Sequence, residues 1–192
     1  MVVAALAAGA GLQFWRTPTP APQPVARVAQ PIPNELVLPT RNRMILAISP
    51  DGSKMVLAAN QRLYLRSLDS LTAVELPGTQ GGGSPFFSPD GQWVGFFAGG
   101  QTKKTPVAGG TPAVICTRDG FDASWTPNDT ILIGTAFAGI LSVSAQGGTP
   151  SVLVKPEPGI LYLKPVSLPD GKSFLYVRGK PGSFESFEGV MR

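Results

Sequence analysis

The chain has 192 residues, of which 43% are hydrophobic, 15% are charged and none is histidine, and its formal net charge is +4. A chain of this length can form one ordinary domain, and so apolar a composition is not that of a disordered protein. The absence of histidine excludes Ser-His-Asp and Cys-His catalysis, histidine-ligated zinc and a histidine proton shuttle at neutral pH.

The first predicted element is the apolar segment 1–15, "MVVAALAAGAGLQFW", which carries no charge and is followed by Arg16. A tryptophan followed by a cation is typical of the end of a membrane helix. At about 1.5 Å per residue the segment covers only about 22 Å of the ~30 Å hydrocarbon core. We therefore predict a truncated transmembrane helix. A signal peptide, here without its basic first region, and a merely apolar soluble start are the alternatives.

Residues 16–34 form a Pro-rich linker, with proline at positions 18, 20, 22, 24, 31 and 33. Alternating prolines remove backbone donors and favour an extended polyproline II spacer. A Pro-rich ligand for an aromatic groove elsewhere is the alternative, but the segment lacks a basic context for it. A membrane helix or a signal peptide before this linker would place the rest of the chain on the extracytoplasmic (periplasmic or extracellular) side of the cell membrane.

A short turn recurs along residues 35–192. The copies are "ISPDGSKMVLAA", "FSPDGQWVGFFA", "WTPNDTILIGTA" and "SLPDGKSFLYVR", whose prolines stand at 50, 89, 127 and 169. A β-prone run follows each turn, and after the first three turns two further such runs follow, as in "RLYLRSL" and "AVELPG". The pattern predicts four short strands per repeat, with repeats starting near 44, 83, 121 and 160. A period near forty with four strands is typical of a β-propeller blade.

The repeated turn closely resembles the PD40 (WD40-like) repeats of TolB-like β-propellers, over residues 44 to about 178. Three sequence segments resemble the extracytoplasmic region of bacterial membrane-anchored serine/threonine protein kinases: "FAGGQTKKTPVAGGTPAVIC", "SPFFSPDGQWVGFF" and "VSAQGGTPSVL". They follow an apolar segment and a Pro-rich linker, as in those proteins. The resemblance implies an all-β propeller of four-stranded blades, six or more when complete, and a kinase domain before the membrane helix.

Two features depart from that pattern. The third copy reads Thr126-Pro127-Asn128-Asp129, where Asp stands in place of the expected glycine. Only about three and a half blades are present, so we expect further blades beyond Arg192 or an open edge that promotes dimerisation or aggregation. Residues 35–40, "ELVLPT", are predicted to supply the outer strand of a last blade.

The sequence contains no catalytic motif. It lacks a kinase Gly-rich loop with its lysine, H-R-D and D-F-G, and "SPDGQW" is one residue short of a sialidase-type Asp box. We predict no catalytic, cofactor-binding or metal-binding residues and identify no ligand-binding residues. The carboxylates available for paired chemistry are chiefly Asp51, Asp69, Asp90, Asp119, Asp122, Asp129, Asp170, Glu75, Glu157, Glu185 and Glu188.

Several of these residues have simpler structural interpretations. Asp51, Asp90 and Asp170 occupy equivalent turns and are expected to cap those turns rather than converge. The glycine triplet 81–83 is expected to be an inter-strand loop, because no helix start follows it. Cys116 lies in an apolar run and is expected to be a buried strand thiol.

The prediction for function is a non-catalytic binding module, tethered to a membrane by its N-terminal segment, for a protein, peptide or glycan. Its lysines and arginines are scattered, so no nucleic-acid partner is expected. The resemblance suggests the sensor portion of a kinase whose kinase domain is not in this chain. The alternatives are the propeller of a prolyl-oligopeptidase-type peptidase, with a hydrolase domain downstream, and a periplasmic TolB-like protein.

Overall fold

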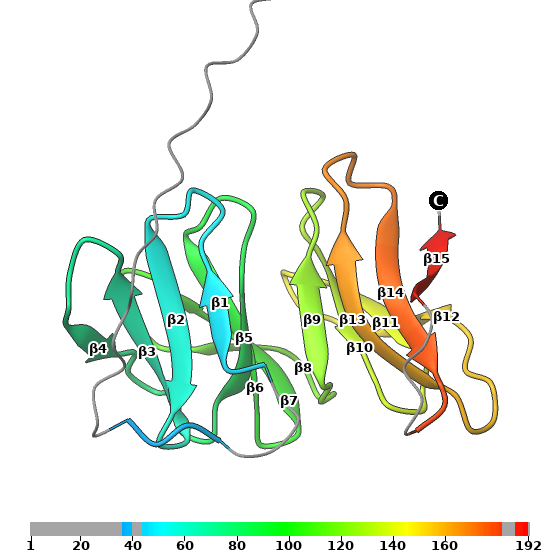
Figure 1. The fold of residues 1–192 in the computed structure, drawn as a ribbon, viewed down its shortest axis with the longest axis horizontal. Helices are drawn as coiled ribbons and strands as arrows, with labels where there is room; N and C mark the ends of the chain where they lie inside the picture. The colour runs from blue at the N-terminus through cyan, green and yellow to red at the C-terminus, as the bar shows by residue number, and fades with distance from the viewer. Residues whose placement is uncertain (1–35, 40–43, 182–186, 192) are drawn as a thin grey trace, which may run out of the picture. The chain divides into compact units, whose positions relative to one another are not determined.

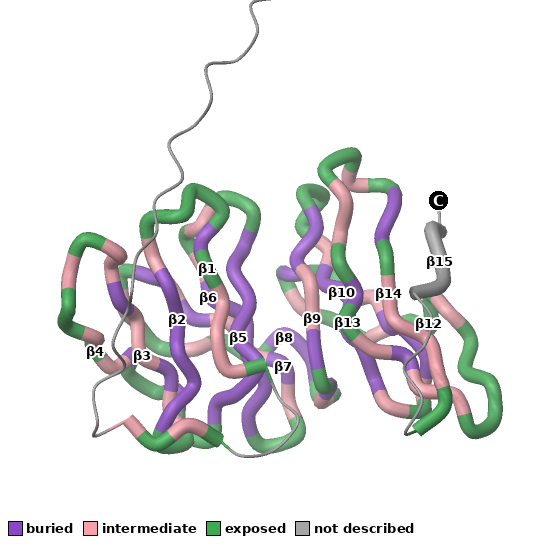
Figure 2. The backbone as a smooth tube through the Cα atoms, viewed as in Figure 1, coloured by how far each residue is buried: buried purple, intermediate pink, exposed green. Residues whose placement is uncertain are grey.

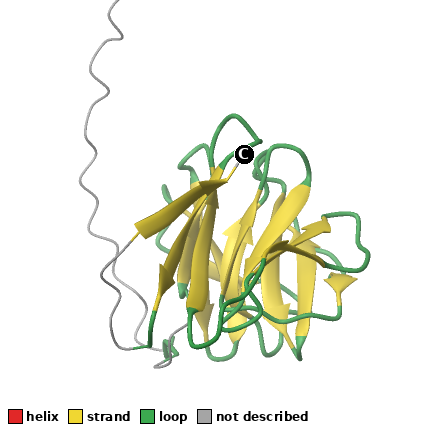
Figure 3. Ribbon diagram, turned by 90° about the vertical axis from the view of Figure 1, so that its right-hand side faces the viewer, coloured by secondary structure: helices red, strands yellow, loops and turns green. Residues whose placement is uncertain are grey.

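The computed structural model describes residues 36–39, 44–181 and 187–191. The predicted membrane segment (1–15) and linker (16–34) lie outside these residues. Figure 3 shows strands and loops in the described part and no helix, and hence none that could cross a membrane. This result confirms the all-β fold class.

The described residues form four antiparallel sheets, which we call the first to fourth blades (Figure 1). Within each blade the spatial order of the strands is their order in the chain, because successive strands pair as hairpins. The first blade comprises β1 (Leu46–Ile48), β2 (Lys54–Ala59), β3 (Arg62–Ser67) and β4 (Ala73–Glu75). The second comprises β5 (Gly83–Phe87), β6 (Trp93–Ala98), β7 (Gln101–Pro106) and β8 (Ala113–Cys116).

The third blade repeats the four-stranded arrangement, and the fourth has three strands among the described residues. The third comprises β9 (Asp122–Trp125), β10 (Thr130–Gly134), β11 (Ile140–Ser144) and β12 (Ser151–Val154). The fourth comprises β13 (Leu161–Ser167), β14 (Phe174–Gly179) and β15 (Phe187–Met191). These sheets confirm the prediction of about three and a half four-stranded blades.

Each repeated turn joins the first strand of a blade to the second. The fourth residue of the turn donates its backbone N–H to the carbonyl of the first, in the pairs Gly52–Ser49, Gly91–Ser88, Asp129–Thr126 and Gly171–Leu168. The glycines have φ of +63° to +71°, the left-handed region in which a side chain is strained. Backbone geometry therefore favours glycine at this position.

Three buried apolar clusters lie between consecutive blades, and Figure 2 shows the buried residues running along the central strands β2, β6 and β10. The cluster between the first and second blades includes Val56, Leu63, Val94 and Phe96. The next, between the second and third, includes Phe86, Phe97, Trp125, Ile131 and Leu141. The last, between the third and fourth, comprises Leu132, Ile140, Tyr162 and Phe174. Each blade thus buries a face on its neighbour, as one sheet cannot do alone.

The interface between the second and third blades depends on close packing around Gly95. A Cβ added at Gly95 would lie 2.2 Å from ring atoms of Phe86, so the aromatic ring occupies the space of the missing side chain. Phe86 in turn contacts Phe97 and Trp125, with ring centroids 6.2 and 6.3 Å apart. Phe86 belongs to this cluster, Trp93 packs against it and Phe96 belongs to the preceding cluster, so all three side chains lie between blades.

The fourth blade has two unlike faces. Tyr162, Phe174 and Tyr176 pack toward the third blade. Pairing places Val166 opposite Leu175 on the other face, where these two side chains are 53% and 43% exposed. This face therefore carries apolar side chains without being buried.

Residues 36–39 contact the first blade. The Val37 N–H donates to Asn60 Oδ1, and the Asn60 N–H donates to the Val37 carbonyl, each at 2.9 Å. These four residues form no strand with the first blade. Asn60, in the left-handed conformation between β2 and β3, presents both a backbone donor and a side-chain acceptor to them. Whether they complete a last blade in a closed ring stays a prediction.

Candidate functional site

The turn Ser88–Gly91 is held together by its own side chains. The Ser88 hydroxyl donates to Asp90 Oδ1, which also accepts the Gln92 N–H at 3.0 Å. The Ser88 hydroxyl oxygen accepts the Trp93 N–H at 2.9 Å. The Ser88 hydroxyl, and then the Gln92 amide, lower the pKa of Asp90 below its ordinary value, since both bonds favour the carboxylate. Asp90 therefore stays charged and fixes the turn.

The aspartates at the equivalent positions do the same. Asp51 accepts hydrogen bonds from the Ser49 hydroxyl and from the backbone and hydroxyl of Ser53. Asp170 accepts the backbone N–H groups of Lys172 and Ser173 at 3.0 and 2.9 Å. The pKa of each is lowered, by the Ser49 hydroxyl first for Asp51 and by the Ser173 amide first for Asp170. The prediction that these aspartates cap their own turns is confirmed.

The third turn reaches the same backbone conformation with Asp129 in place of glycine. Asp129 has φ of +57°, and its carboxylate accepts hydrogen bonds from Trp125 Nε1 at 2.9 Å and from Gln146 Nε2 at 2.7 Å. Asp tolerates this conformation better than most side chains. The departure from the repeat therefore links the turn to a side chain at the end of β9 and to one that follows β11.

A cavity of about 360 Å³, which we call the turn cleft, opens where the second and third turns meet. Its volume lies within the range of about 300–1,000 Å³ typical of ligand sites. The side chains that define it come from both blades: Asp90, Trp93, Lys104, Trp125, Asp129 and Gln146. Aromatic walls with a few convergent polar groups are the usual composition of a binding pocket.

Lys104 of β7 lies over both tryptophans of the turn cleft. Its Nζ is 4.9 Å from the centroid of Trp93 and 5.9 Å from that of Trp125. Both distances are within the range of a cation–π attraction. Among the described residues the Lys104 ammonium makes no hydrogen bond or ion pair, so its N–H donors are not consumed by the protein.

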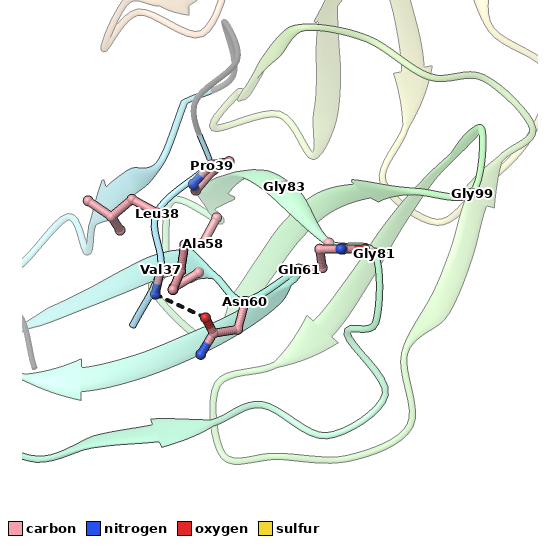
Figure 4. Close-up of a pocket in the computed structure, with 11 residues that line it drawn as sticks. Val37, Leu38, Pro39, Ala58, Asn60, Gln61, Gly81, Gly83 and Gly99 are labelled. Carbon is pink, nitrogen blue, oxygen red and sulfur yellow. Dashed lines mark hydrogen bonds between the residues drawn. The ribbon is translucent and has the colours of Figure 1, made fainter. Parts of the chain in front are cut away.

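A second cavity, of about 640 Å³, lies beside the β2–β3 turn and is shown in Figure 4. Its walls are mainly small or apolar: Val37, Leu38, Pro39, Ala58, Ala59 and the glycines 81–83 and 99. The backbone N–H groups of Gly81 and Gly82 donate to Gln61 and Thr79 carbonyls at 2.7 and 2.9 Å. Gly81 and Gly82 thus lie in an inter-strand loop, as predicted, whereas Gly83 is the first residue of β5. We consider the turn cleft the stronger candidate site because its polar groups converge.

Asp122 is the one acidic side chain buried among the residues whose side chains are described. It lies at the start of β9, and its Oδ2 accepts the Lys164 N–H at 3.3 Å. Burial raises the pKa of Asp122 above its ordinary value, against the smaller opposing effects of the Lys164 amide and charge. It is a structural contact between the third and fourth blades.

Among the described residues, no group of three histidines, cysteines or carboxylates could hold a metal ion. Glu185 lies outside the described residues, and the side chain of Glu188 is not described. Cys116 is buried on β8, as predicted. Sequence reasoning did not single out Lys104, Trp125 or Gln146, because their proximity depends on how neighbouring blades pack. The one usable signal was the departure at Asp129.

No protein-family model and no curated protein matches this sequence. Solved structures do match the fold. A putative TolB from Agrobacterium tumefaciens has a TM-score of 0.58 at 20% identity, and TolB from Acinetobacter baumannii has 0.59 at 22%. They cover 72% and 73% of this chain. An oligogalacturonate lyase from Vibrio parahaemolyticus has a TM-score of 0.57 at 16% identity, and the match covers 76% of this chain.

The chain spans 54%, 38% and 50% of the lengths of those three proteins. At such identities the likeness establishes the fold alone. It confirms the resemblance to TolB-like β-propellers that the repeated turn indicates.

Proposed function

We propose that this chain, which has a TolB-like β-propeller fold, is a non-catalytic ligand-binding segment of a larger, exported and membrane-tethered protein. The observation that carries the proposal is the turn cleft, where two neighbouring blades bring aromatic and polar side chains together around about 360 Å³. The repeated aspartates Asp51, Asp90 and Asp170 bond within their own turns and do not converge as a catalytic pair. The cleft therefore has the features of a binding site rather than of an acid–base pair.

The apolar segment 1–15 and the Pro-rich linker support export and tethering, with the propeller on the extracytoplasmic side. The sequence of the repeats supports a serine/threonine protein kinase as the attached domain, and the propeller would then be its sensor. This part of the proposal depends on sequence resemblance. In this arrangement a ligand would bind between the blades on one side of the membrane, and the kinase domain would lie on the other side.

Reading the coding DNA on both sides of this segment tests the arrangement. We expect an upstream frame with H-R-D and D-F-G and further PD40 repeats downstream. A downstream hydrolase with a G-x-S-x-G motif would overturn the kinase arrangement and favour a peptidase. A cleaved signal peptide with no flanking domain would favour a free periplasmic protein.

A reporter fusion tests export. An enzyme that is active only outside the cytoplasm, fused after residue 192, should be active in a bacterial host. The same fusion with residues 1–15 deleted should be inactive and serves as the control. Equal activity of the two fusions would contradict export through this segment.

A further inference from the structure

We propose that the turn cleft binds a neutral, hydroxyl-rich ligand, such as an uncharged oligosaccharide, between Trp93, Lys104 and Gln146. This inference rests on the proposed ligand-binding function and names the chemical class that the cleft would accept. It is carried by the unused hydrogen-bonding capacity of the cleft, by its charge and by a comparison with the other blade interfaces.

The cleft contains both acceptors and donors that the described residues leave unused. Asp90 uses Oδ1 for its turn, whereas its Oδ2 accepts no hydrogen bond from them. Gln146 donates through Nε2 to Asp129, and its Oε1 likewise accepts none from the described part of the chain. The Lys104 ammonium supplies N–H donors. A ligand hydroxyl, which both donates and accepts, is matched by this combination.

Asp51 in the first blade shows that the free oxygen of Asp90 is not a property of the repeat. There the Ser53 hydroxyl donates to Asp51 Oδ2 at 2.7 Å, so both carboxylate oxygens are bonded within the turn. At the corresponding position the second turn has Gln92, whose side-chain amide lies 3.5 Å from the Asp90 backbone carbonyl oxygen instead. The sequence change therefore leaves one carboxylate oxygen of the second turn available to a ligand.

The charges of the cleft select against ionic ligands. An anion would face the carboxylates of Asp90 and Asp129 with one lysine to offset them. A cationic ligand could bind the indole faces only by displacing the Lys104 ammonium, which already lies over both rings. A neutral ligand meets neither cost. Its apolar C–H surface can pack on an indole while its hydroxyls bond the polar groups.

The other blade interfaces show that the fold does not require these side chains. The second strand begins with Trp93, β7 carries Lys104 opposite Gly95, and Trp125 precedes the next turn. At these three positions the interface between the first and second blades has Lys54, Leu65 and Phe87, and that between the third and fourth has Thr130, Ser142 and Ser167. A blade interface therefore forms with quite different residues, and the set in the turn cleft is specific to this one.

Tryptophan fluorescence of the whole chain provides the assay. The chain has three tryptophans, so a Trp15→Phe background leaves Trp93 and Trp125 as the only tryptophan emitters, both in the cleft. The probes are neutral tetrasaccharides of glucose, mannose, galactose or N-acetylglucosamine. Tetragalacturonate is the anionic probe and tetramethylammonium the cationic one. We expect saturable binding of at least one neutral tetrasaccharide and weaker binding of both charged probes.

Two variants connect binding to the cleft. Gln146→Ala and Lys104→Met should each raise the Kd for the neutral tetrasaccharide about tenfold, because each removes one polar partner. Gln146 is exposed, so its substitution is expected to leave the fold intact. Lys103→Met is the matched control, because Lys103 precedes Lys104 on β7 and faces the other side of the sheet. Its Kd should change less than about twofold.

The possible outcomes separate this inference from the proposed function. Tighter binding of a charged probe, abolished by Gln146→Ala, would overturn the neutral class while retaining the ligand-binding site. No saturable binding of any neutral tetrasaccharide, or binding that both variants leave unchanged, would overturn the inference itself. The export and coding-DNA tests do not depend on either result.

Discussion

The interface between the second and third blades and the outer face of the fourth blade occupy equivalent places in the repeat but have opposite environments. Gly95 on β6 and Leu175 on β14 each lie on the face that points toward the following blade. Gly95 is buried with the Phe86 ring in its side-chain space, whereas Leu175 is 43% exposed. The same strand position is therefore core or surface according to whether another blade covers it.

Large-to-small substitutions should show the largest difference in the free energy of unfolding between the buried interface and the outer face of the fourth blade. Phe97→Ala should reduce the free energy of unfolding by about 3–5 kcal/mol, because Phe97 is fully buried between blades and its loss leaves a cavity. Leu175→Ala should cost at most about 1 kcal/mol, because much of the side chain is already in water. Urea denaturation of both variants measures the difference. Equal losses would mean that the outer face of the fourth blade is covered in solution.

A small-to-large change tests the close packing at the same repeat position. Gly95→Ala should destabilise the chain by about 1–3 kcal/mol, because the new methyl group overlaps the Phe86 ring. The double variant Gly95→Ala/Phe86→Leu removes the ring and should lose less than the sum of the two single losses. Strict additivity in denaturation experiments would contradict the contact.

The pH dependence of stability should differ in sign between Asp122, between the third and fourth blades, and Asp90 in its turn. Burial raises the folded-state pKa of Asp122, so the folded state holds that proton more tightly than the unfolded state. The stabilising contribution of protonated Asp122 to the free energy of unfolding is lost as pH rises from about 3.9 through the raised pKa. Asp122→Asn should remove this loss and make the chain relatively more stable at neutral pH.

Asp90→Asn is the control with the opposite sign. The folded-state pKa of Asp90 is lowered, so its contribution is present above about 3.9 and is lost as pH falls through the folded value. The Asp90→Asn variant should therefore have a lower free energy of unfolding than the original chain at neutral pH, but not at low pH. Melting temperatures from pH 3 to 8 measure both effects, and parallel profiles for the two variants would contradict this assignment.

The smallest effect on stability is expected on the outer face of the fourth blade. Val166→Lys with Leu175→Lys should change the free energy of unfolding by less than about 1 kcal/mol, because both side chains are already about half exposed. The double variant should instead reduce dimerisation or aggregation, since charge opposes association through an apolar face. Sedimentation velocity provides the measurement. Val74→Lys with Val114→Lys, on the exposed outer strands of other blades, is the control.

Much of the architecture could be predicted because it is locally encoded. A turn such as Ser88–Gly91 needs proline, a bonding aspartate and a glycine with positive φ within four residues, and each copy marks a blade. The third turn departs from this pattern, yet Asp129 adopts the left-handed conformation and accepts two hydrogen bonds. The contacts of residues 36–39 were not predictable, because they depend on Asn60, which is distant in sequence.

The sequence by itself determined the all-β fold, the repeats within residues 44–181 and the role of the repeated aspartates, because turn chemistry and strand patterning act over a few residues. Tertiary structure alone decided that Trp93, Lys104, Trp125 and Gln146 share one cleft. These residues come from two repeats, and their contact depends on the face-to-face packing of whole sheets. The physical reason is that a blade is specified by its own residues, whereas a site between blades is specified by the packing of neighbours.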